Sequence, residues 1–221
     1  MRTKYLTPLL LLLVVSCSKP GENQAQNSRV ETLPFYKEAT FTPDWLEPDS
    51  EELQDYHKIP AFNLINQLGD TVTEASLTGK IYVSDFFFTT CPGICPKMTT
   101  NMGLLQEEFL EDDDIMLLSH SVTPEIDNVI MLQNYAEAKG VKAEKWHLLT
   151  GDRKTIYDLG RKSYFVEEDQ GVDKTEDEFL HTENFVLIDQ NRHIRGIYNG
   201  LNKASVSQLI ADIKTLKKEI L

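Results

Sequence analysis

Two cysteines, Cys91 and Cys95, bound the segment CPGIC directly after the strand-like run at 81–88. Two thiols at this spacing can close a disulfide, exchange with another disulfide, or hold a soft metal ion. The motif has one residue more than the C-x-x-C of redox enzymes, and the wider loop suits a metal as readily as a disulfide. A third group beside the sulfurs must decide between these chemistries.

Histidine is the side chain that most often completes such a site. Among the histidines, His181 is the candidate, because it lies between a polar loop and the apolar run at 185–188. Two thiolates and one imidazole suit copper, and zinc with a fourth ligand is the alternative. The remaining four have structural interpretations: surface positions for His57 and His193, a strand position for His147 and a strand end for His120.

The N-terminus indicates export. Arg2 and Lys4 precede the apolar run at 9–15, which is too short to span a bilayer, and Ser16-Cys17 follows. This pattern resembles a bacterial lipobox, so we expect a signal peptide at 1–16, lipidation of Cys17 and a flexible tether at 17–34. An ordinary signal peptide or a short signal anchor is the alternative.

Cysteine count and charge narrow the class of protein. The chain has three cysteines, so a lipidated Cys17 leaves only the pair at 91 and 95 for the folded part. Removal of residues 1–16 lowers Lys+Arg from 22 to 20 against 35 acidic residues, a net charge near −15. Such a chain repels nucleic acid and anionic membrane surfaces, which excludes both as charge-driven partners.

Strands and helices alternate along the rest of the chain. Residues 29–57 are expected to be irregular or edge strands, and 167–178 an acidic loop. The expected strands are 59–65, 81–88, 114–121, 146–149, 185–188 and 194–198, and the expected helices 95–110, 128–139, 153–162 and 205–220. This order predicts an α/β, thioredoxin-like fold at 35–221, with a central mixed sheet flanked by helices and an N-terminal extension. In that fold the start of 185–188, and so His181, lies near the cysteine turn.

The turn itself favours thiolate chemistry. Cys91 is expected at the strand-to-helix turn and Cys95 in the first helical turn, where the partial positive charge of a helix N-terminus lowers a thiol pKa. Asp85, in the preceding strand, could tune the thiols or be an ordinary hydrogen-bonded aspartate. Met98 and Met102 could be auxiliary ligands, although core positions fit them better. The acidic run 112–114 fits a solvated turn better than a cation site, and the second thiol argues against a cysteine hydrolase.

Three segments resemble the Sco/SenC family. FTTCPGICP at 88–96 is similar to its F-T-x-C-P-x-x-C-P motif, SVTPE at 121–125 to S-V-D-P-E, and HTENFVLID at 181–189 to the segment that carries the third copper ligand. The resemblance implies a thioredoxin-like fold and one copper ion held by Cys91, Cys95 and His181. It also implies a role in building the dinuclear copper site of cytochrome c oxidase. Leu180 stands where the family usually has an aspartate, and Thr123 replaces the aspartate of S-V-D-P-E.

The leading hypothesis is therefore a copper metallochaperone, lipid-anchored in the bacterial cell envelope with its domain facing the periplasm. Its expected partners are the copper-site subunit of cytochrome c oxidase and a copper donor protein or thiol reductant. The alternative is a thiol-disulfide oxidoreductase that keeps oxidase or other exported cysteines reduced, in which Cys91 attacks and Cys95 resolves. A redox-sensing or peroxide-reducing domain is a third, weaker interpretation.

Overall fold

The computed structural model describes residues 27–167 and 179–220. The expected signal peptide, Cys17, most of the tether and most of the acidic loop lie outside these ranges. Within them, no helix combines the length and apolar character that crossing a membrane requires.

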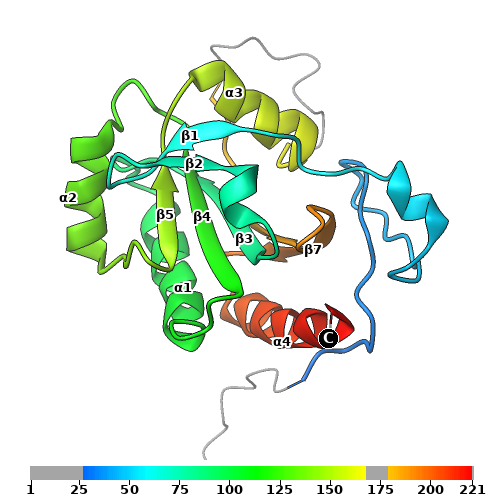
Figure 1. Ribbon diagram of the computed structural model, residues 1–221. Coiled ribbons are helices and arrows are strands. Elements are labelled where there is room, and N and C mark those ends of the chain that lie inside the picture. Colours follow the sequence, from blue (N-terminus) through cyan, green and yellow to red (C-terminus); the bar gives the residue numbers. More distant parts are fainter. Residues whose placement is uncertain (1–26, 168–178, 221) are drawn as a thin grey trace, which may run out of the picture.

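A five-stranded mixed sheet forms the centre of the domain, as expected (Figure 1). Its order is β5 (Trp146–Leu149), β4 (Ile115–Ser121), β3 (Ile81–Phe87), β6 (Asn184–Ile188) and β7 (Ile194–Asn199). The first three are mutually parallel, and β6 and β7 form an antiparallel hairpin against β3. All seven residues of β3 are buried because both faces of the sheet are covered.

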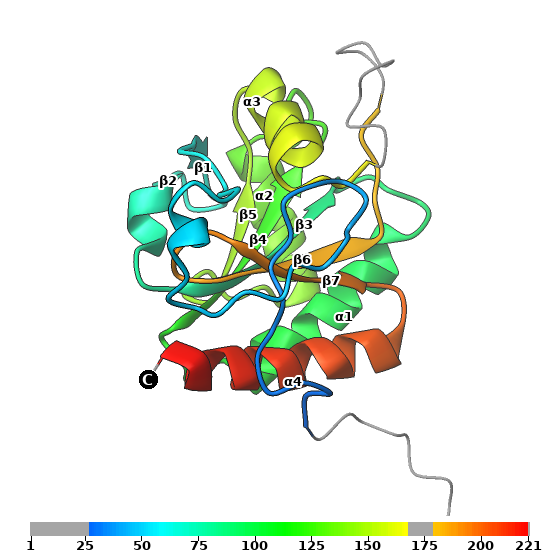
Figure 2. The same ribbon diagram turned by 90° about the vertical axis from the view of Figure 1, so that its right-hand side faces the viewer.

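Helices cover the two faces unequally. One core packs α1 (Cys95–Glu108), α2 (Val129–Lys139) and α4 (Lys203–Ile220) against one face. The other packs α3 (Arg153–Asp158) and the small hairpin of β1 (Asn63–Ile65) and β2 (Thr71–Thr73) against the opposite face. Figure 2 shows α1 and α4 on one side of the sheet and α3 on the other. The side chains of β3 alternate between the two cores, and α1 follows its C-terminal end.

Helix α2 begins and ends where its sequence indicates. The side chain of Asn128 accepts a hydrogen bond from the Met131 N–H, and Gly140 ends the helix with φ 68°. A left-handed residue at this position is most easily a glycine, since it has no Cβ to clash.

Two expected elements differ in the structure. The strand expected at 59–65 is reduced to β1, because Pro60 has no N–H and Ile59 donates its own N–H to the Arg192 carbonyl at 2.9 Å. The helix expected at 153–162 is α-helical only to Asp158 and continues as a π-helix, Leu159–Ser163. Residues 29–57 are mostly irregular and contain the 3-10 helix Glu51–Gln54; a second 3-10 helix, Glu74–Leu77, follows β2.

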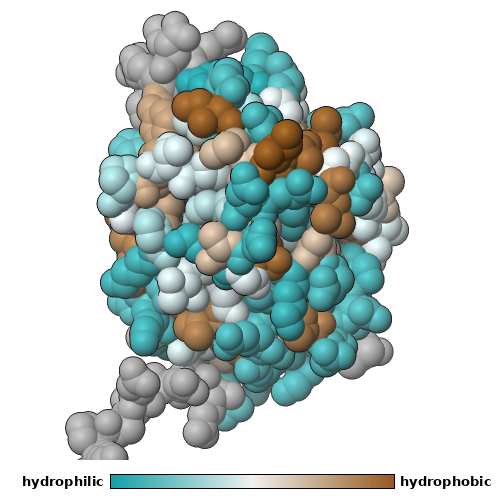
Figure 3. Space-filling model, turned by 90° about the vertical axis from the view of Figure 1, so that its left-hand side faces the viewer, coloured by the Kyte–Doolittle hydropathy of each residue, from teal (hydrophilic) through white to brown (hydrophobic). Residues whose placement is uncertain are grey.

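The face formed by α2 and the small hairpin is largely hydrophilic, with a few apolar side chains in its upper part (Figure 3). The exposed large apolar residues include Leu68 in the hairpin turn, Ile126 in the segment before α2, and Ile130 at the start of α2. Most other large apolar residues are buried in the two cores, consistent with a chain that carries 26% charged residues.

Candidate metal centre

The thiol pair lies where β3 gives way to α1. Cys91 closes a turn by donating its N–H to the Phe88 carbonyl at 3.3 Å, and α1 begins at Cys95 with Ile94 as its N-cap. Pro96 follows at the first helical turn, where a missing N–H costs nothing. The expected positions, Cys91 in the turn and Cys95 in the first helical turn, are confirmed. Both thiols are free; Cys91 is partly exposed and Cys95 is buried.

The two thiols have opposite acidities. Burial raises the pKa of Cys91, but hydrogen bonds from the Cys95 thiol and the backbone N–H groups of 93–95 outweigh it and leave that pKa lowered. Burial, then the hydrogen bond to Cys91, raises the pKa of Cys95 to about 12. Of the two sulfurs, Cys91 therefore loses its proton more readily.

Asp85 lies behind the pair in β3. Burial raises the pKa of its carboxyl to about 7, and a short hydrogen bond from the Ser119 hydroxyl opposes that rise. Its charge contributes to the raised pKa of Cys95. Asp85 is thus a buried, hydrogen-bonded aspartate, and its tuning of the thiols stays a prediction.

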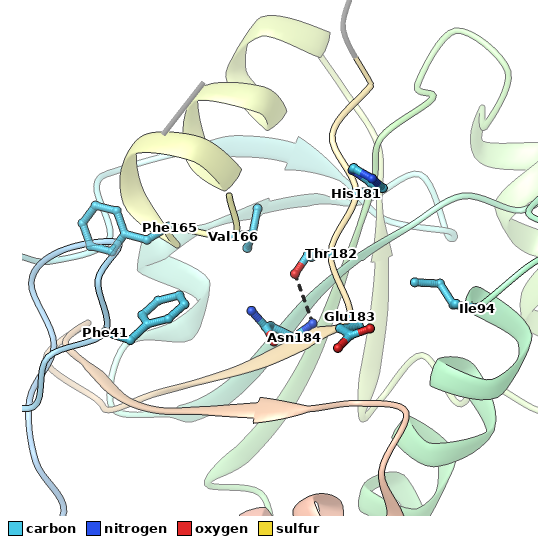
Figure 4. Close-up of a pocket in the computed structure, with 8 residues that line it drawn as sticks. All are labelled: Phe41, Ile94, Phe165, Val166, His181, Thr182, Glu183 and Asn184. Atoms are coloured by element: carbon cyan, nitrogen blue, oxygen red, sulfur yellow. Dashed lines mark hydrogen bonds between the residues drawn. The ribbon is translucent and has the colours of Figure 1, made fainter. Parts of the chain in front are cut away.

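One pocket of about 340 Å³ brings Cys91, Cys95 and His181 together. Its other walls are largely apolar and include Phe88, Phe179 and Leu180. The exposed His181 is on the segment that leads into β6, as the sequence predicts, and also borders a neighbouring pocket of about 420 Å³ (Figure 4). In that view His181 lies on the same side of the segment as Ile94, at the start of α1, with Phe41 and Phe165 on the other side.

The three side chains share a pocket without forming a closed ligand set. Among the described residues, no three His, Cys, Asp or Glu side chains are grouped closely enough to hold a metal ion. The donor types fit a soft metal, but a copper ion bound by all three would require His181 to move toward the sulfurs.

Leu180 is a core residue. It is fully buried, and its Cδ1 would lie 2.5 Å from a Cβ added at Gly160. Where the family pattern has an aspartate, this leucine packs among apolar side chains, and an unpaired carboxylate would be costly there.

The remaining candidates divide between expected and unexpected positions. Met98 and Met102 are buried core residues, and Asp112 pairs with Lys217 beside a turn, as expected. The surface assignment of His193 is wrong: it is 3% exposed and packs against Phe35 and Tyr56, which arrive from the N-terminal extension.

Two further histidines pack against aromatic rings. His57 is only half-buried, with its ring against Phe165, and His120 is buried within β4 and stacked on Phe86.

Sequence reasoning missed Asp127. This fully buried carboxylate accepts hydrogen bonds from the Thr89 N–H and hydroxyl and from the hydroxyls of Ser121 and Thr123. The sequence shows only an aspartate six residues after a strand, and no local pattern indicates that it reaches the thiol turn.

Comparisons with known proteins identify relatives of this chain. The chain is 31% identical over 163 residues to the SCO1 protein homolog of Bacillus subtilis, covering 72% of this chain and 82% of that protein. A SCO1/SenC family lipoprotein from Bacillus anthracis superposes with a TM-score of 0.63 at 29% identity, covering 73% of this chain and 95% of that one.

Two other solved structures describe relatives by their activity. BsSco, a member of the Sco family of cytochrome c oxidase assembly proteins with a disulfide switch, has a TM-score of 0.62 at 30% identity and covers 73% and 94% of the two chains. Arabidopsis thaliana ScoI with copper bound has a TM-score of 0.54 at 26% identity and covers 73% and 96%. The SCO1/SenC family model matches residues 50–218, and the chain therefore belongs to the SCO1/SenC family.

Proposed function

We propose that this protein binds one copper ion through Cys91, Cys95 and His181 and delivers it to the copper-site subunit of cytochrome c oxidase. The observation that carries the proposal is the single pocket shared by two thiols and one imidazole. Copper bound to the Arabidopsis relative and the oxidase-assembly role of BsSco's family support the same assignment.

The pocket suits a copper ion that must be held and then released. Thiolates select Cu(I), and apolar walls exclude water that would compete for the metal. Binding must expel the proton of Cys95, whose pKa is raised by burial, so affinity increases with pH. His181 is exposed and can move in to close the site or out to open it for transfer.

The proposed location rests on the lipobox-like N-terminus. A lipid on Cys17 would hold the domain at a membrane of the bacterial cell envelope, facing the periplasm. Its partner there would be a protein that donates copper or a reductant that supplies electrons to the thiols. The lipoprotein nature of the Bacillus anthracis relative supports this anchor.

The test is an anaerobic Cu(I) titration of the reduced, lipid-free chain against a competing chelator. We expect one equivalent for the wild type, loss of tight binding for Cys91→Ser, and an affinity about tenfold or more lower for His181→Ala. His147→Ala is the matched control, since this histidine lies in β5 on the far side of β4, and should bind like the wild type. Wild-type affinity in His181→Ala would contradict the three-ligand site.

A second function, thiol-disulfide exchange, is favoured by the asymmetry of the pair. A partly exposed Cys91 with a lowered pKa beside a buried Cys95 is the arrangement of an attacking and a resolving thiol. His181→Ala separates the two functions, because it should weaken copper binding and leave the rate of exchange with a disulfide peptide unchanged. A reduction potential far below that of the compartment's reductants would exclude the reductase role.

A further inference from the structure

Asp127 connects the two strand ends that flank the thiol turn. It follows β4 in the turn Thr123–Asp127, closed by its own N–H donating to the Thr123 carbonyl at 2.8 Å. From there its carboxylate reaches across to the end of β3, where it accepts the Thr89 N–H at 3.1 Å and the Thr89 hydroxyl on its other oxygen. Both donors of Thr89, its N–H and its hydroxyl, are thus held by one buried side chain.

Thr89 lies inside the turn that carries Cys91. This turn runs from Phe88 to Cys91 and is closed by the 3.3 Å hydrogen bond between them. At its start, Val122 donates its N–H to the Phe87 carbonyl at 2.9 Å, which joins the turn to β4. Fixing Thr89 therefore fixes the direction in which the chain approaches Cys91.

The sulfur of Cys91 depends on that direction. It accepts hydrogen bonds from the Cys95 thiol and from backbone N–H groups at 93–95, so it must lie over the start of α1. A turn free to rotate about Thr89 would carry the Cys91 sulfur away from Cys95 and lower the effective concentration of one thiol at the other.

We infer that Asp127 is a positioning residue for the thiol pair: by holding Thr89 it keeps the two sulfurs close enough to share a bond or a metal ion. Only the part of the inference that concerns metal binding rests on the proposed function. Formation of a bond between the two sulfurs is measurable without copper. A merely structural Asp127 would stabilise the fold equally through each of its hydroxyl donors.

The chain offers a matched pair of variants to separate these roles. Thr89→Val and Ser121→Ala each remove one hydroxyl donor to the same carboxylate, but only Thr89 belongs to the thiol turn. Ser121 also accepts the Thr123 N–H at 3.2 Å, so Ser121→Ala removes more of the local hydrogen bonding than a single donor. Thr89→Ser keeps the hydroxyl and should restore wild-type behaviour.

The measurement is the equilibrium with glutathione, in which the protein dithiol and oxidised glutathione give the protein disulfide and two reduced glutathione molecules. We expect Thr89→Val to lower this equilibrium constant about tenfold, the usual effect of one lost hydrogen bond to a carboxylate. Ser121→Ala and Thr89→Ser should stay within about twofold of the wild type. Cu(I) affinity should fall in Thr89→Val and not in Ser121→Ala.

Asp127→Asn adds a second test, because its amide keeps the shape but turns one acceptor into a donor; thermal unfolding shows whether it folds. Equal equilibrium constants for Thr89→Val and Ser121→Ala would overturn the positioning role whatever Asp127→Asn does. The glutathione equilibrium does not involve copper. A wild type that failed to bind Cu(I) would therefore refute the proposed function, while the glutathione measurement would still test the positioning role of Asp127.

Discussion

Two ionisable side chains in adjacent strands beneath the thiol turn respond to pH in opposite directions. Burial raises the pKa of Asp85 from 3.8 to about 7, and burial lowers the pKa of His120 from 6.5 to about 4. Between pH 4 and 7 the folded state therefore holds a proton on Asp85 that the unfolded chain has lost, so this residue makes stability fall as pH rises. Between pH 4 and 6.5 the unfolded chain holds a proton that folded His120 lacks, so this residue makes stability rise with pH.

Asp85→Asn removes the first effect and keeps the shape of the side chain. We expect its free energy of unfolding, measured in urea, to exceed that of the wild type by an amount that grows with pH from 4 to 7, at up to about 1.4 kcal/mol per pH unit, and is constant above 7. Histidine contributions cancel in this difference. A difference independent of pH would mean that Asp85 titrates normally in the folded protein.

Single residues were predictable from the sequence only where their environment is local. The acidity of Cys91 depends on the next four residues, so a thiol at a helix start could be predicted. The burial of His193 depends on Phe35 and the hydrogen bonds of Asp127 depend on Thr89, partners distant in sequence. Such contacts exist only after the strands are in register.

Helices and turns, like single residues, could be predicted only where nearby residues determine them. Helix α2 could be delimited because Asn128 and Gly140 are local signals, and the thiol turn because an apolar strand meets prolines. The π-helix at Leu159–Ser163 could not, since no local signal marks it and its neighbours Leu180 and Phe86 come from other segments. A wider helical turn of this kind commonly occurs beside a functional site.

Gly160 makes that approach possible. A Cβ at this position would lie 2.5 Å from Leu180 Cδ1 and 3.1 Å from the Phe86 ring, both of which line the thiol pocket. Gly160→Ala should therefore lower the free energy of unfolding by about 1–3 kcal/mol through overpacking. By displacing Leu180 it should also shift His181 and weaken Cu(I) binding, measured in the same competition assay.

Gly103→Ala is the control for this prediction. Gly103 lies in α1 with no atom within 4 Å of an added Cβ, so alanine should stabilise the protein by about 0.5–1 kcal/mol through helix propensity. Equal stability changes in the two variants would show that the π-helix tolerates a side chain and that Leu180 is not confined by it.

At the scale of the whole molecule, Arg195 joins the two ends of the described chain. From β7 its guanidinium donates to the Leu33 and Pro34 carbonyls at 2.6 and 3.1 Å and to Glu219 of α4 at 2.7 Å. It also pairs with Asp189 at 3.3 Å, and its side chain is only 3% exposed. Glu219 completes the connection by accepting the Leu33 N–H at 2.7 Å. The N-terminal extension is thereby part of the domain, although the family model begins at residue 50.

Arg195→Met should consequently release the extension as well as destabilise the fold. It would leave two buried carboxylates without their cation, a change that costs about 3–5 kcal/mol in urea unfolding. Limited proteolysis should then cut within 29–49 under conditions where the wild type is protected. Lys217→Met is the control, because its pair with Asp112 is partly exposed at 29% and 27% and should contribute less than about 1 kcal/mol. If both variants lose similar stability and the extension stays protected, the buried cation does not hold the two ends together, and the apolar contacts of Leu33 and Phe35 must do so.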